Sequence, residues 1–287
     1  MKTSVYLPDH LKRALALHAA ATGRSEAEVV RAAVEAEVTG HAVRAGEPDP
    51  PVRGRLVGVG VGPGDPALVT LQAVAALRRA DRVVAPATAV DAVGRAELIV
   101  RQAVPGVRVD RVPFAMSPRR QDRDLSIAGA ADAVAAWLDE GEVAFVTLGD
   151  PLTYSTFSSV AAAVRRRRPS TVVDQIPGIM AFQALAASTG TVITDEAQRL
   201  VVRTALNGEE VKSDLDDPRA TVVLYKGGRR LPELAEAASA AGRLHGAVAG
   251  ELLGMPGERV GSLSEVAAAG PASYLATVIV PAAEGGA

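Results

Sequence analysis

The sequence predicts an α/β protein with a parallel-sheet first lobe, a strand-rich second lobe and a small helical module in front of them. Three observations predict this. Short apolar runs alternate with helical periodicity from Arg55 onward. From about Thr191 the apolar runs are joined mainly by turns. The first forty residues carry a pattern of their own, and 287 residues exceed the usual size of one domain.

The N-terminal module begins with an expected strand and continues with two expected helices. Thr3 to Leu7 alternate polar and apolar residues, which is the period of a half-buried strand. Asp9 follows a proline, as is typical of a first helical turn, and Gly23 is expected to end this helix. Ser25 followed by Glu28 forms the sequence signature of a capping box, so a second helix is expected to begin there.

The rest of the chain supplies the elements of both lobes. In the first lobe, strands are expected at 56–61, 107–114, 142–148 and 170–176, and helices at 68–80, 122–138 and 156–168. In the second lobe, strand-like runs cover 199–206, 220–227, 243–252, 258–266 and 273–281, with one helix at 232–241. We therefore divide the chain into a module (1–40), a Pro/Gly-rich linker (41–54), a first lobe (55–190) and a second lobe (191–287).

Composition excludes several classes of function. There is no cysteine, so a disulfide framework and a thiolate metal site are excluded, and four scattered histidines give no expected metal site. The net charge of −2 gives no general attraction to nucleic acid or anionic lipid. No apolar run reaches the length of a membrane span, and the N-terminus lacks a signal-peptide pattern. We expect a cytoplasmic protein.

Three loops rich in glycine and proline each follow an expected strand. They are 62–66 (GPGDP), 149–157 (GDPLTYSTF) and 177–182 (PGIMAF). Parallel α/β sheets bind ligands at the carboxyl ends of their strands, so these loops predict a pocket of backbone amides and carbonyls that suits a zwitterionic, adenosine-bearing ligand. The alternatives are that the glycines serve tight turns and that Asp150 is a turn or helix cap.

Taken in order, four segments resemble the tetrapyrrole (corrin/porphyrin) methylase family. They are GVGPGDP (60–66), TLGDPLTYSTF (147–157), QIPGIMAF (175–182) and VVLYKGG (222–228), and the resemblance extends over roughly residues 55–281. The YSTF tetrapeptide is most similar to the branch that methylates precorrin-2, or its cobalt form, at C20. The resemblance implies two α/β lobes, a parallel sheet in the first and a mixed sheet in the second. It also implies a homodimer that binds S-adenosylmethionine between the lobes and releases S-adenosylhomocysteine.

The resemblance also implies roles for individual residues. Those expected at the cofactor are Pro63, Gly149, Asp150, Ser155, Thr156, Ile179, Met180, Ala181 and Tyr225. Those expected at the carboxylates of the tetrapyrrole are Lys226, Arg119, Arg120 and Arg123, with solvated surface charge as the alternative. The base that removes the later proton is not identified by sequence; the candidates are Asp65, Tyr154 and Glu251. The second lobe follows the family pattern less closely at 191–207 and at the Gly-Gly of 227–228. The resemblance therefore defines the identity of the methyl acceptor less well than the identity of the cofactor.

The first 38 residues resemble a ribbon-helix-helix domain. In that family two chains pair their strands into a ribbon that enters the DNA major groove, which would direct Lys2, Ser4 and Tyr6 to the bases. The charges of this segment are balanced, whereas DNA binding draws most of its affinity from a basic excess. We therefore favour dimerisation over operator binding. Two alternatives stay open: a DNA-binding regulator that senses S-adenosylmethionine or a tetrapyrrole, and a methylase of another ring position.

Overall fold

The computed structural model describes residues 8–32, 54–89, 91–115, 119–196, 198–270 and 272–283. The chain divides into two compact units, Met1–Pro50 and Pro51–Ala287, each of which is considered separately. The expected strand at 3–7, the residues Lys2, Ser4 and Tyr6, and all of the expected linker except Gly54 lie outside the described residues. No helix in the described parts of the chain is both long and apolar enough to cross a lipid bilayer.

The first unit contains the two predicted helices. Helix α1 (Asp9–Thr22) ends at Gly23, which adopts the left-handed conformation with φ 64°. Residues 26–32 form the second helix. Its capping box is present, because the Ser25 amide donates to Glu28 Oε2 (2.8 Å) and the Glu28 amide donates to Ser25 Oγ (3.3 Å). Leu11 and Leu17 of α1 are 46% and 73% exposed, so part of its apolar surface has no cover within the described residues.

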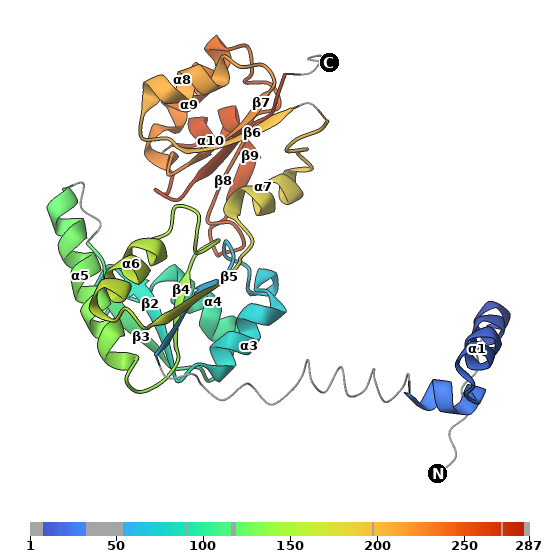
Figure 1. Ribbon diagram of the computed structural model, residues 1–287. Helices are drawn as coiled ribbons and strands as arrows, with labels where there is room; N and C mark the ends of the chain where they lie inside the picture. The colour runs from blue at the N-terminus through green and yellow to red at the C-terminus, as the bar shows by residue number, and fades with distance from the viewer. Residues whose placement is uncertain are drawn as a thin grey trace. The chain divides into compact units, whose positions relative to one another are not determined.

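The second unit contains two five-stranded sheets, and most of their strands are labelled in Figure 1. The first sheet is parallel, in the order β3-β2-β4-β1-β5, and the second is mixed, in the order β6-β7-β10-β8-β9. The strands are β1 (Arg55–Gly60), β2 (Arg82–Ala87), β3 (Val109–Pro113), β4 (Val143–Thr147), β5 (Val172–Ile176), β6 (Arg199–Thr204), β7 (Ala220–Tyr225), β8 (Val248–Glu251), β9 (Arg259–Ser262) and β10 (Thr277–Val280). This arrangement confirms the predicted parallel first sheet and mixed second sheet.

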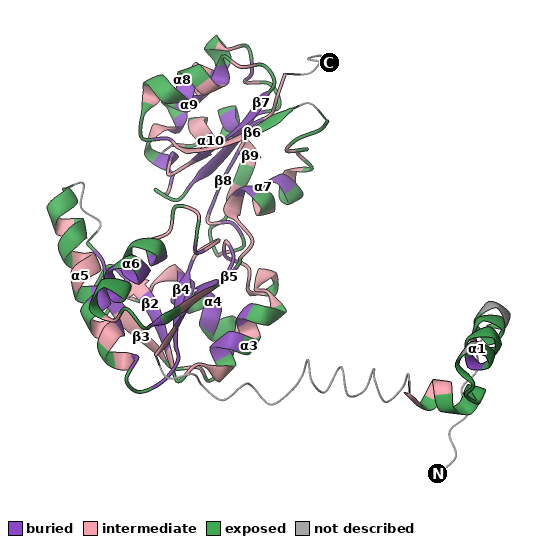
Figure 2. Cartoon of the chain, in the orientation of Figure 1, coloured by how far each residue is buried: buried purple, intermediate pink, exposed green. Residues whose placement is uncertain are grey.

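Helices cover both faces of each sheet. They are η1 (Pro66–Leu68), α3 (Leu71–Arg79), α4 (Arg95–Ala103), α5 (Arg120–Trp137), α6 (Phe157–Arg167), α7 (Ala181–Thr189), α8 (Gly208–Leu215), η2 (Gly228–Arg230), α9 (Leu231–Ala240) and α10 (Leu263–Ala268). In the first sheet, Val57 of β1 packs with α3 and α4, while its neighbour Leu56 packs with α5 and α6. This period of two explains why the central strands β1, β2 and β4 are buried over most of their length, shown as purple in Figure 2, whereas the edge strands β3 and β5 are more exposed.

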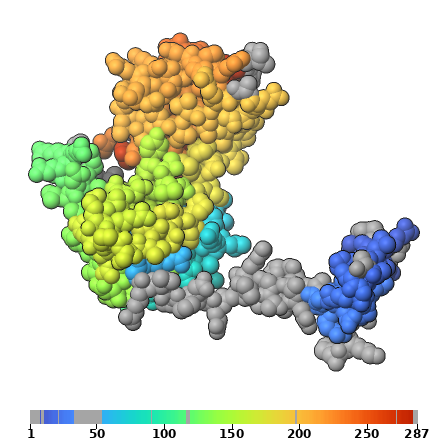
Figure 3. Space-filling view, viewed as in Figure 1, coloured from blue at the N-terminus to red at the C-terminus, as the bar shows by residue number. Residues whose placement is uncertain are grey.

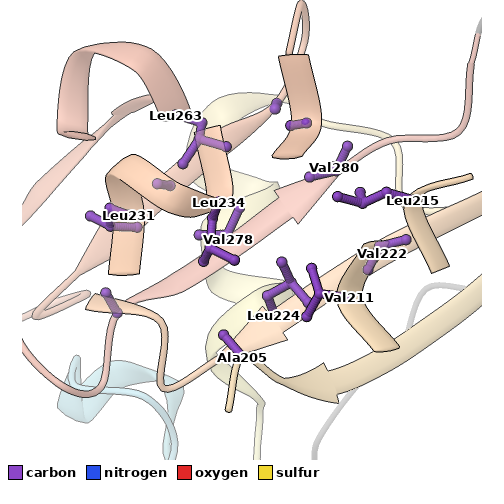
Figure 4. Packing of buried hydrophobic residues seen from close by; sticks show 14 of the residues in the cluster. Ala205, Val211, Leu215, Val222, Leu224, Leu231, Leu234, Leu263, Val278 and Val280 are labelled. Atoms are coloured by element: carbon purple, nitrogen blue, oxygen red, sulfur yellow. The ribbon is translucent and has the colours of Figure 1, made fainter. Parts of the chain in front are cut away.

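The second sheet has the same layered construction. Val222 and Leu224 of β7 face α8, α9 and α10 in the cluster of Figure 4, whereas Val223 faces α7. Arg243 is buried beside this cluster, and its guanidinium donates to backbone carbonyls that include Leu215 (2.8 Å) and Pro281 (2.8 Å). A buried cation is tolerated there because those carbonyls replace the hydrogen bonds it would make to water.

Several elements differ from the sequence-based expectation. The pair β2 and α4 was not predicted, and neither were α7 and α8. The prediction of a single strand over 258–266 is wrong beyond Ser262, because helix α10 begins at Leu263. The Ser262 side chain accepts from the Glu265 amide (3.2 Å) and Glu265 Oε2 accepts from the Ser262 amide (3.0 Å), a capping box that turns the chain into a helix.

Candidate active site

The three glycine-bearing loops lie together at the carboxyl edge of the first sheet. Strand β1 lies between β4 and β5, and all three run parallel, so the loops that follow them are neighbours. The Gly149 amide donates to the Gly62 carbonyl (3.0 Å), which joins the first loop to the second. The Gly178 amide donates to Asp150 Oδ2 (3.3 Å), which joins the second loop to the third. One connected surface therefore contains all three loops.

Glycine is required where the three loops meet. A Cβ atom on Gly60 would lie 2.5 Å from the Gly149 carbonyl oxygen and 2.6 Å from the Gly178 nitrogen. A Cβ atom on Gly178 would lie 2.1 Å from the same carbonyl oxygen. These neighbours are backbone atoms, which no side-chain rotation can move away. The surface that the loops present is therefore formed of closely packed backbone, as the first strand-loop of a nucleotide-binding α/β sheet requires.

The Asp150 carboxylate links two of the loops. Its Oδ1 accepts from the Leu152 amide (2.8 Å), and its Oδ2 accepts from Gly178. The first bond is a local turn of the kind expected for aspartate, so the cap interpretation holds for Oδ1. The second bond fixes the spacing between the second and third loops.

Ser155 and Thr156 lie where the second loop enters α6. The Ser155 hydroxyl is 3.0 Å from the Thr147 hydroxyl and accepts from the Phe157 amide at 3.1 Å. Thr156 is exposed at the start of α6 and makes no side-chain cap hydrogen bond. Ser155 therefore orders the loop, while Thr156 keeps its hydroxyl available at the surface.

The third loop leads into α7 and presents free amide donors. Met180 is the N-cap of α7, and its own amide donates to Gln183 Oε1 (2.9 Å). The amides of Ile179 and Ala181 donate to no acceptor within the described ranges. Met180 and Ala181 also pack against the buried cluster that includes Phe182 and Leu253. This loop therefore offers amide donors beside an apolar surface.

Two tyrosines connect the second loop to the second lobe. The Tyr154 hydroxyl donates to the Val202 carbonyl of β6 (2.8 Å), and its ring meets the Tyr225 ring edge-on at 6.0 Å. Figure 3 shows yellow-green surface of this loop region reaching the orange surface of the second lobe. Burial raises the pKa of Tyr225 to about 12, so its phenol stays protonated and accepts from the Phe182 amide (3.4 Å).

The first loop contacts a turn of the second lobe. A Cβ atom on Gly64 would lie 1.8 Å from the Leu253 carbonyl oxygen, and one on Gly254 would lie 2.4 Å from the Asp65 nitrogen. The turn begins at Leu252, whose φ of 53° is unusual for a residue with a side chain. Pro63 lies half-buried in the same loop. Tyr154 (φ 49°) and Lys226 (φ 62°) share this left-handed conformation, so backbone strain gathers where the lobes meet.

The three candidate bases all have structural partners. Asp65 Oδ1 accepts from the Ala67 amide (2.8 Å) as the N-cap of η1. Glu251 is buried, and its carboxylate accepts from the Arg259 guanidinium and from the Ser273 amide. Tyr154 already donates its proton to β6. None of these contacts identifies a base, so the assignment stays a prediction.

The predicted substrate cations lie on two different elements. Lys226 follows β7, and its Nζ lies 6.0 Å from the centre of the Tyr274 ring. Arg119, Arg120 and Arg123 belong to the start of α5, which follows β3 at the opposite edge of the sheet from β5. Arg120 is largely exposed and pairs with Asp124 at 3.6 Å. The described contacts do not join these arginines to the three loops.

Two close contacts of this site, and one of its residues, were not predicted from the sequence. Gly60 and Gly178 were part of the recognised motifs, but their close mutual approach has no signal in the sequence. The contact of Gly64 with Leu253 joins segments almost two hundred positions apart. Arg95, at the start of the unpredicted helix α4, donates to the Ser273 hydroxyl of the second lobe (3.0 Å).

The family model of the tetrapyrrole (corrin/porphyrin) methylases matches residues 55–267. The chain belongs to this family. Within the family, the chain is 33% identical to the precorrin-2 C20-methyltransferase of a Sinorhizobium species over 239 residues, which cover 79% of this chain and 95% of that protein. It is 28% identical to the cobalt-precorrin-2 C20-methyltransferase of Salmonella typhimurium over 232 residues, or 80% of this chain and 97% of the other.

The fold and the N-terminal segment have matches as well. A solved structure of uroporphyrin-III C-methyltransferase from Thermus thermophilus, in complex with S-adenosylhomocysteine, superposes on the chain with a TM-score of 0.55 at 22% identity. It covers 79% of this chain and 92% of that structure, and it supports the fold. Separately, the family model of the copG-type ribbon-helix-helix proteins matches residues 1–39.

Proposed function

We propose that this tetrapyrrole methylase transfers the methyl group of S-adenosylmethionine to C20 of precorrin-2, or of its cobalt form, in cobalamin biosynthesis. The observation that carries the proposal is the junction of three backbone-lined loops at one edge of the first sheet. The C20 assignment rests on the two relatives, each aligned over almost its full length. Methylation of another position of a tetrapyrrole is the alternative within the same chemistry.

The residues at the loops fit S-adenosylmethionine. Its methionine end carries a carboxylate and an ammonium group, and these require donors and acceptors at close range. The glycines allow the three loops to pack backbone against backbone, because a Cβ atom on Gly60 or Gly178 would meet the backbone of a neighbouring loop. The amides of Ile179 and Ala181 supply donors, and the apolar surface beside Met180 suits an adenine ring. We assign Pro63, Gly149, Asp150, Ser155, Thr156, Ile179, Met180, Ala181 and Tyr225 to this ligand.

The chemistry requires alignment more than acid–base catalysis. S-adenosylmethionine supplies a methyl group that its sulfonium already activates. The chain therefore has to hold the acceptor carbon in line with that methyl group and keep water away. The loop from Asp150 to Phe157 suits this task, since it is fixed to the first sheet through Ser155 and to the second lobe through Tyr154.

The acceptor is proposed to contact the cations on both sides of the site. Tetrapyrroles of this class carry several carboxylates, and a half-buried Lys226 offers a charge for one of them. Arg119, Arg120 and Arg123 could meet others from α5. The protonated Tyr225 and the bridged Tyr154 would supply ring surfaces beside the macrocycle or the cofactor.

The proposal is tested by incubating the full chain anaerobically with precorrin-2 and methyl-labelled S-adenosylmethionine. We expect S-adenosylhomocysteine and a tetrapyrrole product heavier by one methyl group, with the label at C20 in the NMR spectrum. A label at another ring position would replace the C20 assignment with the alternative. If neither precorrin-2 nor its cobalt form is methylated, the proposed C20 methylation is refuted.

The N-terminal unit is proposed to pair two copies of the chain in the cytoplasm. Its match to ribbon-helix-helix proteins and the exposed Leu11 and Leu17 support pairing, and its balanced charges speak against DNA as the main partner. The second candidate function is a regulator that binds DNA through Lys2, Ser4 and Tyr6. Salt-sensitive binding to the promoter of its own gene, without turnover, would favour the regulator over the enzyme.

A further inference from the structure

Two cations from different lobes meet the same short segment, residues 273–274. Arg95, the first residue of α4 in the first lobe, donates to the Ser273 hydroxyl (3.0 Å). Lys226, directly after β7 in the second lobe, places its Nζ 6.0 Å from the centre of the Tyr274 ring. The two cations therefore contact adjacent residues of one segment.

Neither cation has a carboxylate partner among the described residues. Other half-buried arginines of this unit do: Arg111 lies 2.6 Å from Glu97, and Arg203 pairs with Asp214. Glu251 of β8 contacts this segment, but its carboxylate already accepts from the Arg259 guanidinium and from the Ser273 amide. Arg95 and Lys226 therefore bring to this segment two positive charges that no carboxylate of the described residues neutralises.

The position of Lys226 is held at a cost. Its φ of 62° is unfavourable for a residue with a Cβ atom, and burial lowers the pKa of its ammonium group. The chain around it is closely packed, because a Cβ atom on Gly228 would lie 1.8 Å from the Ser273 carbonyl oxygen. Strained backbone and desolvated charges cluster at ligand-binding and active sites, which makes Lys226 a candidate ligand contact.

We propose that Arg95 and Lys226 together bind one peripheral carboxylate of the tetrapyrrole, with one cation supplied by each lobe. The Ser273 hydroxyl, already in contact with Arg95, is placed to join them. This inference rests on the proposed function for the nature of the acceptor, and it adds Arg95, which lies outside every recognised motif. A carboxylate held from both lobes would fix the position of the macrocycle relative to the loops of the first sheet.

The test measures the two ligands separately in Arg95→Gln and Lys226→Gln. Precorrin-2 is titrated anaerobically by absorbance without cofactor, and S-adenosylhomocysteine is titrated by calorimetry. Each variant is expected to raise the Kd for precorrin-2 at least about tenfold, the size of one charge-assisted hydrogen bond, and to leave the Kd for S-adenosylhomocysteine within about twofold. Both are expected to weaken the salt dependence of precorrin-2 binding.

Two matched variants control for general effects. Arg78→Gln removes an exposed charge from the last turn of α3 and is expected to change neither Kd. Arg95→Lys keeps the charge and is expected to recover part of the affinity for precorrin-2. An unchanged Kd for precorrin-2 in both glutamine variants would overturn the proposal. Equal losses for both ligands would also overturn it, since they would assign the cations to folding of the segment.

Failure of the proposed function would be visible in the wild-type chain. If that chain neither binds nor methylates precorrin-2, the C20 assignment fails whatever the variants do. Uroporphyrin III, another tetrapyrrole with several carboxylates, then takes its place in the same titrations. A loss of its binding in Arg95→Gln and Lys226→Gln would uphold the carboxylate site, and unchanged binding would remove it.

Discussion

Replacing Gly178 with alanine is predicted to separate the three loops and abolish tight cofactor binding. The added Cβ atom would lie 2.1 Å from the Gly149 carbonyl oxygen and 2.8 Å from the Gly60 carbonyl carbon. Ordinary contacts of a Cβ atom begin at 3.4 Å, so the backbone of the second loop has to move by about 1 Å. Gly178 does not have a positive φ, so this effect is steric and does not come from backbone strain.

The magnitude follows from the atoms involved. Overpacking that rotamer changes can relieve costs about 1–3 kcal/mol, and here the backbone itself has to yield, so the upper part of this range is expected. For a unit of this size that corresponds to a fall in Tm of roughly 4–12 °C. The hydrogen bond from Gly178 to Asp150 would break as well, and we expect the affinity for S-adenosylhomocysteine to fall at least about a hundredfold, near 2.7 kcal/mol.

Calorimetric titration well below Tm separates the site from the fold. Gly129→Ala is the matched control: nothing lies within 4 Å of its Cβ position, and the residue lies inside α5, so alanine is expected to stabilise the helix by about 0.5–1 kcal/mol. Wild-type affinity for S-adenosylhomocysteine in folded Gly178→Ala would refute the convergence of the loops on the cofactor.

Three further predictions concern the same unit. Asp150→Ala removes the acceptor for Leu152 and Gly178 and is expected to weaken S-adenosylhomocysteine binding about tenfold, roughly 1.4 kcal/mol, by calorimetry; unchanged binding would count against the role of this loop. Deleting residues 1–45 is expected to leave methyl transfer intact, because Met1–Pro50 forms a separate unit; lost turnover in a folded truncation would assign the module to catalysis. Tyr225 has a raised pKa of about 12, so its contribution to stability is full below pH 10 and is lost as pH rises from about 10 to about 12. Tyr225→Phe should reduce this loss in urea unfolding, and identical pH profiles would contradict it.

The sequence predicted best where a local pattern decides the structure. The capping box of Ser25 and Glu28 predicted a helix start, and the apolar runs of β1 and β4 predicted buried parallel strands. The strand β2 was missed because Pro86 interrupts its pattern. It is tolerated there because β2 pairs with β4 only over Arg82–Val84, so Pro86 lies beyond that ladder. Missing β2 also hid α4 and its first residue, Arg95.

Contacts between distant segments could not be predicted in the same way. Helix α10 begins with a Ser-x-x-Glu signature like that of Ser25, but the preceding β9 made the whole run look like a strand. Gly64 and Leu253 touch because the fold brings a loop of one lobe to a turn of the other, which no local period encodes. Sequence therefore predicted the loops proposed to hold the cofactor more fully than the surface proposed to meet the acceptor.

That difference has a physical origin in how the two ligands are bound. The proposed cofactor side is built of backbone atoms, so it requires glycines and short loops after parallel strands, and both leave a pattern in the sequence. The proposed acceptor side is built of charged side chains such as Arg95 and Lys226, carried by α4 and by the turn after β7. Such side chains can change singly without altering the fold, so a shared cofactor site can accompany different acceptor positions within one family. Specificity is accordingly expected to depend on the cations of the second lobe and α4, and the loops of the first sheet should determine affinity for the methyl donor.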